Sequence, residues 1–458
     1  MIDSVRLALF LCVLNKMQAC AADVGCAFLH GRTKEKYCIR AGPEFGDRQG
    51  KYLIIYGSLY GLRSSAARWH EYLSETLGKM GFKPSKADPD LRIKDCGTHY
   101  EYVATYVDDL IFVSKDPMKY IEQLKFEYEM KGVGVPEYYL GGNVDIGTDG
   151  SMYWSAKTYI KNVCDRVEKL FDVTLKSYGS PLEDNYHPEI DESPLLSDDM
   201  VRRYQMLIGC ANWIVILGRF DVMYATVTMA RFSQVPREGH LKAVLRVFGY
   251  LKGYAKAKIT VDPTVPSIQG EVIQHNWSEF YPDAIEELPE DMPTPKGKPV
   301  LITQYVDADH AHDLVTRRSI TGALLYLNST PIKWYSKRQN TVETSTYGSE
   351  LVAARIATEL IMEMRYKLRM LGVPLLGSAV LYGDNQSVVL NTTVPSSTLK
   401  KKHNAIAYHR VREAIAAGVL HFFHVPSEHN VADVLTKPMG PKIFYGHIKN
   451  VLFGARST

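Results

Sequence analysis

Several features that would place the chain in a particular class are missing from its 458 residues. No apolar run reaches the ~20 residues that a membrane-spanning helix needs, so we predict no membrane span. Neither sign of charge dominates, because the chain has 54 Lys and Arg residues and 51 Asp and Glu residues. The resulting net charge of +3 cannot by itself indicate a polyanionic partner. No internal repeat of about 20 to 50 residues is found, so no repeat architecture is predicted.

Cysteine is scarce as well. The chain has seven cysteines, none after Cys210, and no two of them form a CxxC pair. This favours free buried thiols in a reducing compartment. The length of the chain excludes a disulfide-stapled miniprotein. Arg6, the apolar residues 7–14 and Ala19-Cys20-Ala21 loosely resemble a secretory signal. Because Asp3 and the odd number of cysteines argue against export, we interpret this segment as a buried helix and expect a protein that is not secreted.

What is present indicates a folded chain of several domains. Hydrophobic residues make up 46% and charged residues 23%, and the length predicts two to four domains at roughly 100 to 200 residues each. Residues 201–255 carry apolar side chains at helical spacing. Pro263–Pro299 contains seven prolines and several acids, which predicts a linker or a surface excursion.

The part after this segment has a different pattern. We predict strands at 300–306, 322–327 and 332–335, a long helix at 345–371 and a further strand at 379–382. A β-β-β-α-β order indicates an α/β or α+β domain of about 140 residues.

Adjacent acids in the first half suggest a metal site. Asp108 and Asp109 separate the β-rich runs 100–107 and 110–113, which predicts a hairpin with carboxylates at its tip. Asp23 lies in a mostly apolar stretch, where an uncompensated charge is costly to bury. Carboxylates from two elements could hold two magnesium ions, activate a 3′-hydroxyl and stabilise a leaving pyrophosphate. The alternative for the Asp pair is an ordinary turn.

The C-terminal part offers acids on four separate predicted elements, namely Asp307, Glu350, Asp384 and Asp433. Together they could surround two magnesium ions and activate water against an RNA phosphodiester. The alternative is that they are unrelated surface acids.

The sequence segments around these acids resemble known motifs. Asp23–Phe28 and Tyr106–Asp109 resemble motifs A and C of reverse transcriptases, and Ser58–Trp69 between them is similar to the "LYGLKQAPRAW" element of copia-type retrotransposon polymerases. The resemblance covers residues 1 to about 255. It departs from the family pattern at Ser64 and Ala66, and at Phe220 in place of a proline.

This resemblance implies roles for individual residues. Asp23 and Asp108 would ligate magnesium, with Asp109 adding charge and geometry at the same site. Phe28 would be a steric gate that selects deoxyribonucleotides. The residues implied to line the nucleotide and template pocket, or to approach a phosphate, are Tyr60, Gly61 and Arg63. The alternatives are a core Phe and a solvated Arg.

The second set of strings looks like the ribonuclease H domain of copia-type elements. The matching strings are Tyr305–Asp309, Arg317–Gly322, Ser349–Leu351, Tyr382–Ser387 and Ala432–Pro438. The resemblance implies that all four acids bind Mg²⁺, with Mn²⁺ as an alternative ion. Asp309 remains a substitute for Asp307.

Basic and histidine residues complete the candidates. The basic cluster 400–403, with Lys401 and Lys402, is expected to touch nucleic-acid phosphates, with a solvated face as the alternative. Zinc binding by His421, His424 and His429 is not expected, because no cysteine is near and the spacing fits no common finger.

The resemblance as a whole predicts an α+β and α/β multidomain fold, in which a reverse transcriptase palm with thumb-like helices precedes a ribonuclease H-like mixed sheet with flanking helices. The expected segments are a palm with most of the fingers missing (1–155), a thumb- or connection-like helical region (156–260), an acidic Pro-rich linker (261–299), the ribonuclease H-like domain (300–440) and a C-terminal tail (441–458).

The expected activities are RNA-directed DNA synthesis and ribonuclease H cleavage. Expected partners are an RNA template, a DNA primer, RNA/DNA hybrids, deoxynucleoside triphosphates and other Pol or Gag products, in a cytoplasmic virus-like particle or the nucleus. Only 22 residues precede Asp23, so we expect little polymerase activity from this chain alone. The alternative is a catalytically decayed, nucleic-acid-binding remnant of a transposon.

Overall fold

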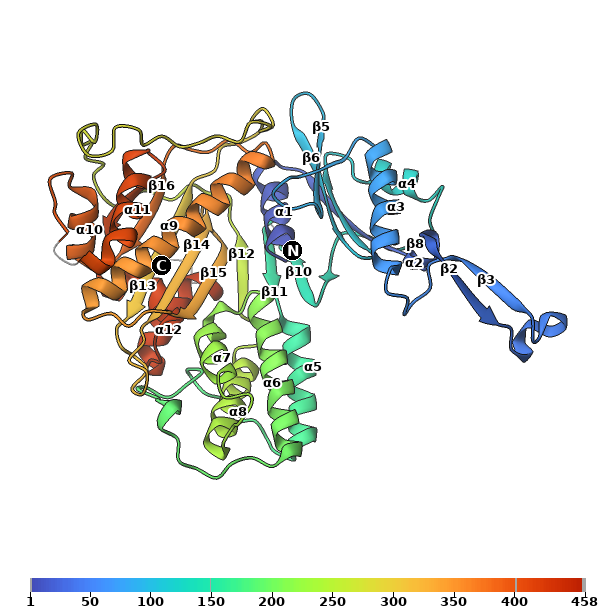
Figure 1. The fold of residues 1–458 in the computed structure, drawn as a ribbon, viewed down its shortest axis with the longest axis horizontal. Coiled ribbons are helices and arrows are strands. Elements are labelled where there is room, and N and C mark those ends of the chain that lie inside the picture. Colours follow the sequence, from blue (N-terminus) through green and yellow to red (C-terminus); the bar gives the residue numbers. More distant parts are fainter. Residues whose placement is uncertain (1, 149, 400–401, 455–458) are drawn as a thin grey trace. The chain divides into compact units, whose positions relative to one another are not determined.

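The computed structural model describes residues 2–148, 150–399 and 402–454. The chain divides into two compact units, Asp3–Pro136 and Glu137–Thr458, and each has its own sheets and helices (Figure 1). Among the helices in the described ranges, none combines the length and apolar character needed to cross a bilayer.

The first unit is built on a six-stranded antiparallel sheet with the order β4-β5-β6-β7-β1-β8. Its strands are β1 (Gln18–Val24), β4 (Lys83–Pro84), β5 (Leu91–Asp95), β6 (Tyr100–Tyr106), β7 (Asp109–Ser114) and β8 (Met130–Gly134). Its helices are α1 (Ile2–Leu14), α2 (Ala27–His30), α3 (Ser65–Lys79) and α4 (Met118–Leu124). The predicted hairpin is formed by β6 and β7, and the predicted buried helix is α1, where Phe10 and Leu11 are fully buried.

One face of this sheet is covered by α3 and α4. Trp69, Leu73 and Leu77 recur every four residues along α3 and so form one apolar stripe. This stripe packs with Leu110 and Phe112 of β7 in the core of the unit. Because side chains alternate between the two faces of a strand, the residues between these core positions project from the opposite face.

A two-stranded antiparallel ribbon, β2 (Arg32–Arg40) and β3 (Tyr52–Gly57), forms a sheet of its own and extends away from the six-stranded sheet (Figure 1). The turn of 3₁₀ helix η1 (Pro43–Arg48) lies between the two strands. A lone ribbon buries little apolar surface, and Tyr52 and Tyr56 are 75% and 77% exposed.

The second unit begins with a four-stranded sheet and a group of helices. The sheet has the order β12-β11-β10-β9. Its strands are β9 (Tyr138–Tyr139), β10 (Gly142–Ile146), β11 (Met152–Ser155) and β12 (Lys258–Val261), and the helices are α5 (Lys157–Phe171), α6 (Asp198–Ile216), α7 (Met223–Ala230) and α8 (Glu238–Gly253). The four helices lie side by side (Figure 1).

The boundary between the units differs from the one expected at residue 155. The first unit ends at Pro136, and β9, β10 and β11 belong to the second unit. The reason is that β11 pairs with β12, which lies far along the chain, beyond the four helices. A pairing of this kind leaves no local signal in the sequence.

A buried ion pair lies between α6 and α7. The Arg219 guanidinium donates to both oxygens of Asp221 at 2.9 and 2.7 Å, and the Tyr250 hydroxyl donates to the same carboxylate at 2.6 Å. Arg219 and Asp221 are each 1% exposed. Phe220 between them is fully buried, with its ring centroid 5.8 Å from that of Trp334. The residue that replaces the family's proline therefore has a packing role.

The rest of the second unit contains a five-stranded mixed sheet with the order β15-β14-β13-β16-β17. Its strands are β13 (Ile302–Asp309), β14 (Ile320–Leu327), β15 (Thr330–Arg338), β16 (Ala379–Gly383) and β17 (Leu420–His424). The first three strands pair antiparallel, whereas β16 is parallel to both β13 and β17. A mixed sheet flanked by helices was expected for residues 300–440, and this prediction is confirmed.

Helices cover this sheet. They are α9 (Thr346–Met370), α10 (Gln386–Thr393), α11 (Ala405–Ala416) and α12 (Pro441–Leu452), with short turns η4 (Lys402–Asn404), η5 (Ser427–His429) and η6 (Val431–Leu435). The long helix α9 lies across β13, β14 and β16 (Figure 1). Ser345 accepts a hydrogen bond from the Gly348 N–H and so caps the start of α9. The predicted helix at 345–371 matches α9 closely.

The expected linker and the expected tail are both packed against the second unit. Residues 262–301, all of which the structure describes, form no helix or strand. They are nevertheless held to α9, because Glu286 accepts hydrogen bonds at 2.6 Å from both Arg365 and Arg369. In the expected tail, α12 buries Phe444 and Ile448. The first segment is thus a surface excursion, the second of the two alternatives.

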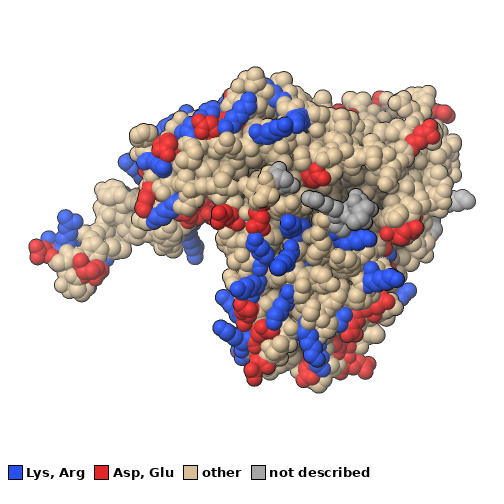
Figure 2. Space-filling model, turned by 180° about the vertical axis from the view of Figure 1, so that it is seen from behind, with Lys and Arg blue, Asp and Glu red and all other residues tan. Residues whose placement is uncertain are grey.

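Charges on the surface are mixed. Figure 2 shows basic and acidic side chains interspersed over the lower part of the face in view. This agrees with the nearly balanced composition of the chain.

Candidate active sites

The first group of acids lies at the end of two paired strands. Asp23 in β1 and Asp109 in β7 are direct partners in the antiparallel ladder. Their neighbours Ala22 and Leu110 enter the core under α3 and α4, so Asp23 and Asp109 project from the opposite face of the sheet. Asp108 precedes β7, and its carbonyl accepts a hydrogen bond from the Val24 N–H at 2.9 Å. The structure therefore brings the three predicted acids together.

Burial and mutual repulsion perturb these acids. The pKa of Asp109 rises to about 6, first because of burial and then because of the charges on Asp108 and Asp23. Burial also raises the pKa of Asp23, as does the charge on Asp108, while Lys131 acts in the opposite direction. Carboxylates that repel one another are stabilised by a bound cation, and an all-oxygen donor set fits Mg²⁺.

The turn that carries Asp108 is held by a helix. Val107, at the tip of the β6–β7 hairpin, has a φ of 55°, which is a strained conformation for a β-branched residue. Its carbonyl accepts a hydrogen bond from the indole N–H of Trp69, a buried residue of α3. This contact offsets the strain and fixes the direction of the turn toward β1.

Four further residues were expected to contact nucleotide or template. Phe28 of α2 and the exposed Tyr60 lie together, with ring centroids 4.7 Å apart and a tilt of 47°. Gly61 has a φ of 99° and open space around it, so the turn after Tyr60 requires a glycine-like backbone. Arg63 is exposed before α3 and, among the described residues, forms no ion pair with the acids.

The second group of acids converges more tightly. Asp307 lies in β13, Glu350 in the first turns of α9, and Asp384 directly after β16. One carboxylate oxygen from each lies within 4.8 Å of the other two. Asp307 and Glu350 are buried and Asp384 is half-buried. Among the residues that the structure describes, the three acids of the first group do not meet this distance.

The fourth predicted acid, Asp433 in η6, lies near Asp307, and the ammonium group of Lys437 contacts both carboxylates. Lys437 Nζ lies 3.0 Å from Asp433 Oδ2 and 3.7 Å from Asp307 Oδ2. The Thr436 hydroxyl donates a hydrogen bond to Asp307 Oδ2. The other oxygen of Asp433, Oδ1, is buried and has no hydrogen-bond partner among the described residues.

The electrostatics of this group favour cation binding. Burial first, and then the charge on Asp307, raise the pKa of Asp433 to about 8. Burial also raises the pKa of Asp307, although Lys437 opposes this effect. The pKa of Glu350 lies well above its usual value because of burial and of the charges on Asp307 and Asp384. Three convergent carboxylates beside an unpartnered carboxylate oxygen fit a divalent ion with hard oxygen ligands.

Three supporting residues were missed from the sequence. Thr436 and Lys437 hold Asp307 and Asp433, and Ser427 Oγ donates to Asp384 Oδ2 at 2.7 Å. The signal for Lys437 was its position four residues after Asp433, which places both on one face of a helical turn. Ser427 had no comparable local signal.

Asp309, the sequence alternative to Asp307, is engaged elsewhere. Its carboxylate pairs with His312 Nδ1, and His312 Nε2 lies 2.7 Å from the Tyr224 hydroxyl. Asp309 therefore serves a contact between β13 and α7, and the structure assigns the position in the acid group to Asp307.

The basic cluster is only partly described. Lys401 lies outside the described residues, while Lys402 is exposed at the start of η4. Of the histidines considered for zinc, His424 Nε2 lies 3.1 Å from the Asp384 carbonyl oxygen, and none belongs to either described group with metal-ligand geometry.

The other group with metal-ligand geometry is Cys96, His99 and Glu101 in the first unit. Glu101 is 1% exposed and already accepts hydrogen bonds from the hydroxyls of Ser114 and Tyr120, at 2.7 and 2.5 Å. Its carboxylate is therefore satisfied by the protein, and we interpret the cluster as a structural hydrogen-bond network.

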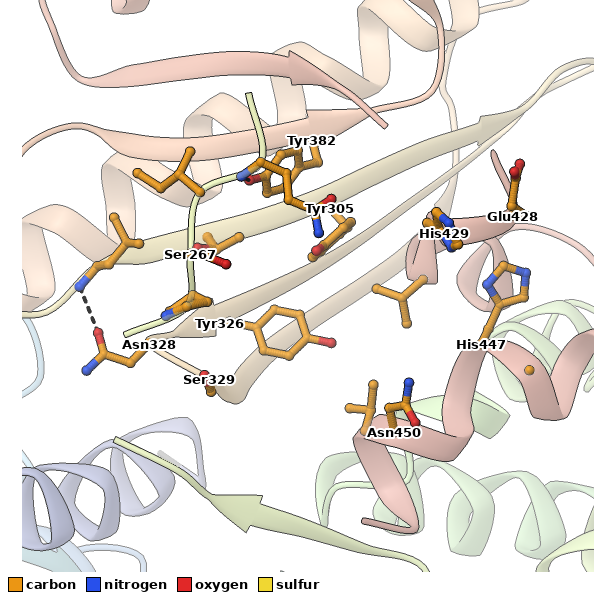
Figure 3. A pocket seen from close by; sticks show the side chains of 18 residues that line it. Ser267, Tyr305, Tyr326, Asn328, Ser329, Tyr382, Glu428, His429, His447 and Asn450 are labelled. Atoms are coloured by element: carbon orange, nitrogen blue, oxygen red, sulfur yellow. Dashed lines mark hydrogen bonds between the residues drawn. The ribbon is translucent and has the colours of Figure 1, made fainter. Parts of the chain in front are cut away.

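A cavity of about 420 Å³ lies in the second unit (Figure 3). One wall is formed by Tyr326, Tyr305 and Tyr382 on three adjacent strands, and the opposite side includes His429 and His447. None of the four acids of the second group lines this cavity, which is thus distinct from the metal-ligand group.

Comparisons with known proteins give relatives for most of the chain. Residues 1–176 match the family described as reverse transcriptase (RNA-dependent DNA polymerase). The chain is 25% identical over 446 residues to the retrovirus-related Pol polyprotein from transposon RE1 of Arabidopsis thaliana, covering 96% of this chain and 28% of that protein. It is 24% identical to the Pol polyprotein from transposon TNT 1-94 of Nicotiana tabacum, covering 95% and 31%. The chain thus spans less than a third of the length of these two relatives.

One shorter relative is matched by this chain over its whole length. The putative transposon Ty5-1 protein of Saccharomyces cerevisiae is 26% identical over 351 residues, which are 75% of this chain and 100% of that protein. Among solved structures, the foamy viral protease-reverse transcriptase in complex with an RNA/DNA hybrid is 12% identical with a TM-score of 0.41, covering 91% of this chain and 45% of that one. Residues 1–176 thus match a reverse transcriptase family, and over most of its length the chain is similar to the Pol polyproteins of copia-type retrotransposons.

Proposed function

We propose that the second unit hydrolyses the RNA strand of RNA/DNA hybrids and requires a divalent ion, Mg²⁺ or alternatively Mn²⁺. The observation that carries this proposal is the convergence of Asp307, Glu350 and Asp384 within 4.8 Å, although they come from separate elements. Buried acids at such distances repel one another, so their approach serves a cation rather than the stability of the fold.

The residues present would act as follows. Asp307, Glu350 and Asp384 would hold the ion, which when bound would activate water and neutralise charge at the scissile phosphate. Thr436 and Ser427 orient the carboxylates of Asp307 and Asp384 through their hydroxyls. Because Asp307 and Glu350 are buried on a strand and a helix, their oxygens are held in place before substrate binds.

Metal removal gives the first test. We expect the full-length chain to cleave the labelled RNA strand of an RNA/DNA hybrid in Mg²⁺, to lose cleavage in EDTA and to regain it when Mg²⁺ is restored. Single-stranded RNA and a DNA duplex should remain intact under the same conditions, because the proposed substrate is the hybrid. Equal cleavage with and without EDTA, or none in Mg²⁺, would contradict the nuclease proposal.

We further propose that the first unit adds deoxynucleotides to a DNA primer on an RNA template. Support comes from the direct pairing of Asp23 with Asp109 and from the reverse transcriptase match over residues 1–176. Asp23 and Asp108 would hold the ions, and Phe28 would discriminate against the 2′-hydroxyl of a ribonucleotide.

Primer extension tests this second activity. We expect weak extension by the wild-type chain and none by Asp108→Asn, because the substitution removes a metal-ligating charge. Asp116→Asn, which changes an exposed acid of the same unit, is the matched control and should extend like wild type. Extension by Asp108→Asn at the wild-type level would refute the assignment.

The proposed partners follow from these activities. They are an RNA template, a DNA primer, deoxynucleoside triphosphates and other Pol or Gag products, in a cytoplasmic particle or the nucleus. The competing proposal, a decayed remnant that only binds nucleic acid, would be supported if the chain bound hybrids yet showed neither activity.

A further inference from the structure

A lysine stands inside the second group of acids. Lys437 Nζ contacts Asp433 Oδ2 at 3.0 Å and lies 3.7 Å from Asp307 Oδ2. Of the basic side chains that the structure describes, no other forms an ion pair with Asp307, Glu350, Asp384 or Asp433. The ammonium therefore supplies the positive charge nearest to two carboxylates that are themselves 2% and 7% exposed.

The backbone explains why the lysine reaches this position. The N–H groups of Thr436 and Lys437 both donate to the Asp433 carbonyl, at 3.1 and 3.3 Å, so the chain makes a helical turn after Asp433. This turn directs the side chain of Lys437 back over Asp433. Thr436 is fully buried and bonded to Asp307, which anchors the turn. The Lys437 side chain is nevertheless 36% exposed, so the ammonium has a path to solvent.

The four acids are thereby divided into two parts. Asp307, Glu350 and Asp384 share a position that no described side-chain cation fills. Asp307 and Asp433 share a second position, where Lys437 uses one oxygen of each. A divalent ion bridging Asp307 and Asp433 would lie close to the Lys437 ammonium, and the two positive charges would repel each other.

We propose that the Lys437 ammonium occupies the second cation position of this site. The free protein then takes up one divalent ion, at Asp307, Glu350 and Asp384, and a second ion enters only after Lys437 has moved away. One divalent ion together with the ammonium nearly balances four carboxylates, so the free protein gains little from a second ion. This inference rests on the proposed nuclease function and adds control over the number of ions bound.

Substrate provides a means of moving the lysine. The phosphates of an RNA/DNA hybrid are alternative partners for an ammonium group. If the hybrid draws Lys437 away from Asp433, binding of hybrid and uptake of the second ion support each other.

Counting bound Mn²⁺ by electron paramagnetic resonance tests the proposal without relying on activity. The full-length chain carries Asp23→Asn and Asp108→Asn throughout, so that the counted ions report on the second acid group. We expect one bound ion with Lys437 or with Lys437→Arg, and two with Lys437→Gln, with at least about tenfold tighter binding of the second ion. Lys442→Gln, an exposed lysine on α12, is the matched control and should bind one ion.

Thermal unfolding is the second measurement. In EDTA we expect a lower Tm for Lys437→Gln than for the Lys437 protein, because the acids lose their internal counter-ion, and a larger rise of Tm when Mn²⁺ is added. Two ions in the Lys437 protein without substrate would overturn the proposal, and so would one ion in Lys437→Gln. Should Lys437→Gln fail to fold, the ion count of the Lys437 protein still decides.

The outcome can be separated from that of the proposed function. Hybrid cleavage with equal ion counts in the Lys437 protein and Lys437→Gln would overturn only the inference about Lys437. Absence of both hybrid cleavage and ion binding would overturn the nuclease proposal as well.

Discussion

Asp384→Asn is expected to lower the rate of RNA/DNA hybrid cleavage at least about 10³-fold. Asp384 is half-buried and the most accessible of the three convergent acids, and an amide in its place carries no negative charge and is a poor ligand for a hard cation. The measurement is the initial rate of cleavage of labelled hybrid at saturating Mg²⁺. Asp309→Asn, which changes the acid held by His312, should retain the wild-type rate within about threefold.

Stability separates loss of catalysis from loss of folding in this variant. Because Asp384→Asn removes one negative charge from a group of like charges, its Tm in EDTA should equal or exceed that of wild type. Loss of cleavage together with a Tm below the assay temperature would trace the loss to unfolding instead of to the missing metal ligand. Unchanged cleavage would contradict a metal-ligating role directly.

Asp221→Asn is expected to destabilise the second unit by about 3–5 kcal/mol. Arg219 and Asp221 are each 1% exposed, and the carboxylate accepts hydrogen bonds from Arg219 and from the Tyr250 hydroxyl. Replacing the carboxylate would leave the Arg219 charge buried without a counter-ion. Urea unfolding of the full-length chain, followed by tryptophan fluorescence, should show the transition of the second unit at markedly lower urea.

Two further variants test the physical reason. Asp199→Asn removes the partner of Arg202 and Arg203 in two surface ion pairs, where the Asp199 side chain is 56% exposed, and should cost at most about 1 kcal/mol. The double variant Arg219→Met/Asp221→Leu should recover part of the stability lost in Asp221→Asn, because neither charge then remains buried. If Asp221→Asn were as stable as wild type, the buried pair would have no structural role.

Local patterns predicted much of the secondary structure. The β-rich runs on either side of Asp108 and Asp109 indicated a hairpin, and β6 and β7 form it. The helical spacing of apolar residues over 345–371 predicted a helix, and this helix is α9. These predictions hold because the strand preference of a residue and helical periodicity depend on neighbouring residues only.

Other features depended on partners far along the chain. The boundary expected at residue 155 lies at Pro136, since β11 pairs with β12. The expected tail contains α12, whose Phe444 and Ile448 are buried, although nothing local shows what they pack against.

The sequence by itself determined which residue types lie in which elements. Its motifs predicted the site acids, which are Asp23, Asp108, Asp109, Asp307, Glu350, Asp384 and Asp433. Only the tertiary structure decided which acids meet, that Asp309 pairs with His312 instead, and that Lys437 stands between Asp307 and Asp433. The physical reason is that attraction and repulsion between charges act over a few ångströms in space, and the folding of β13, α9, β16 and η6 onto one another sets those distances.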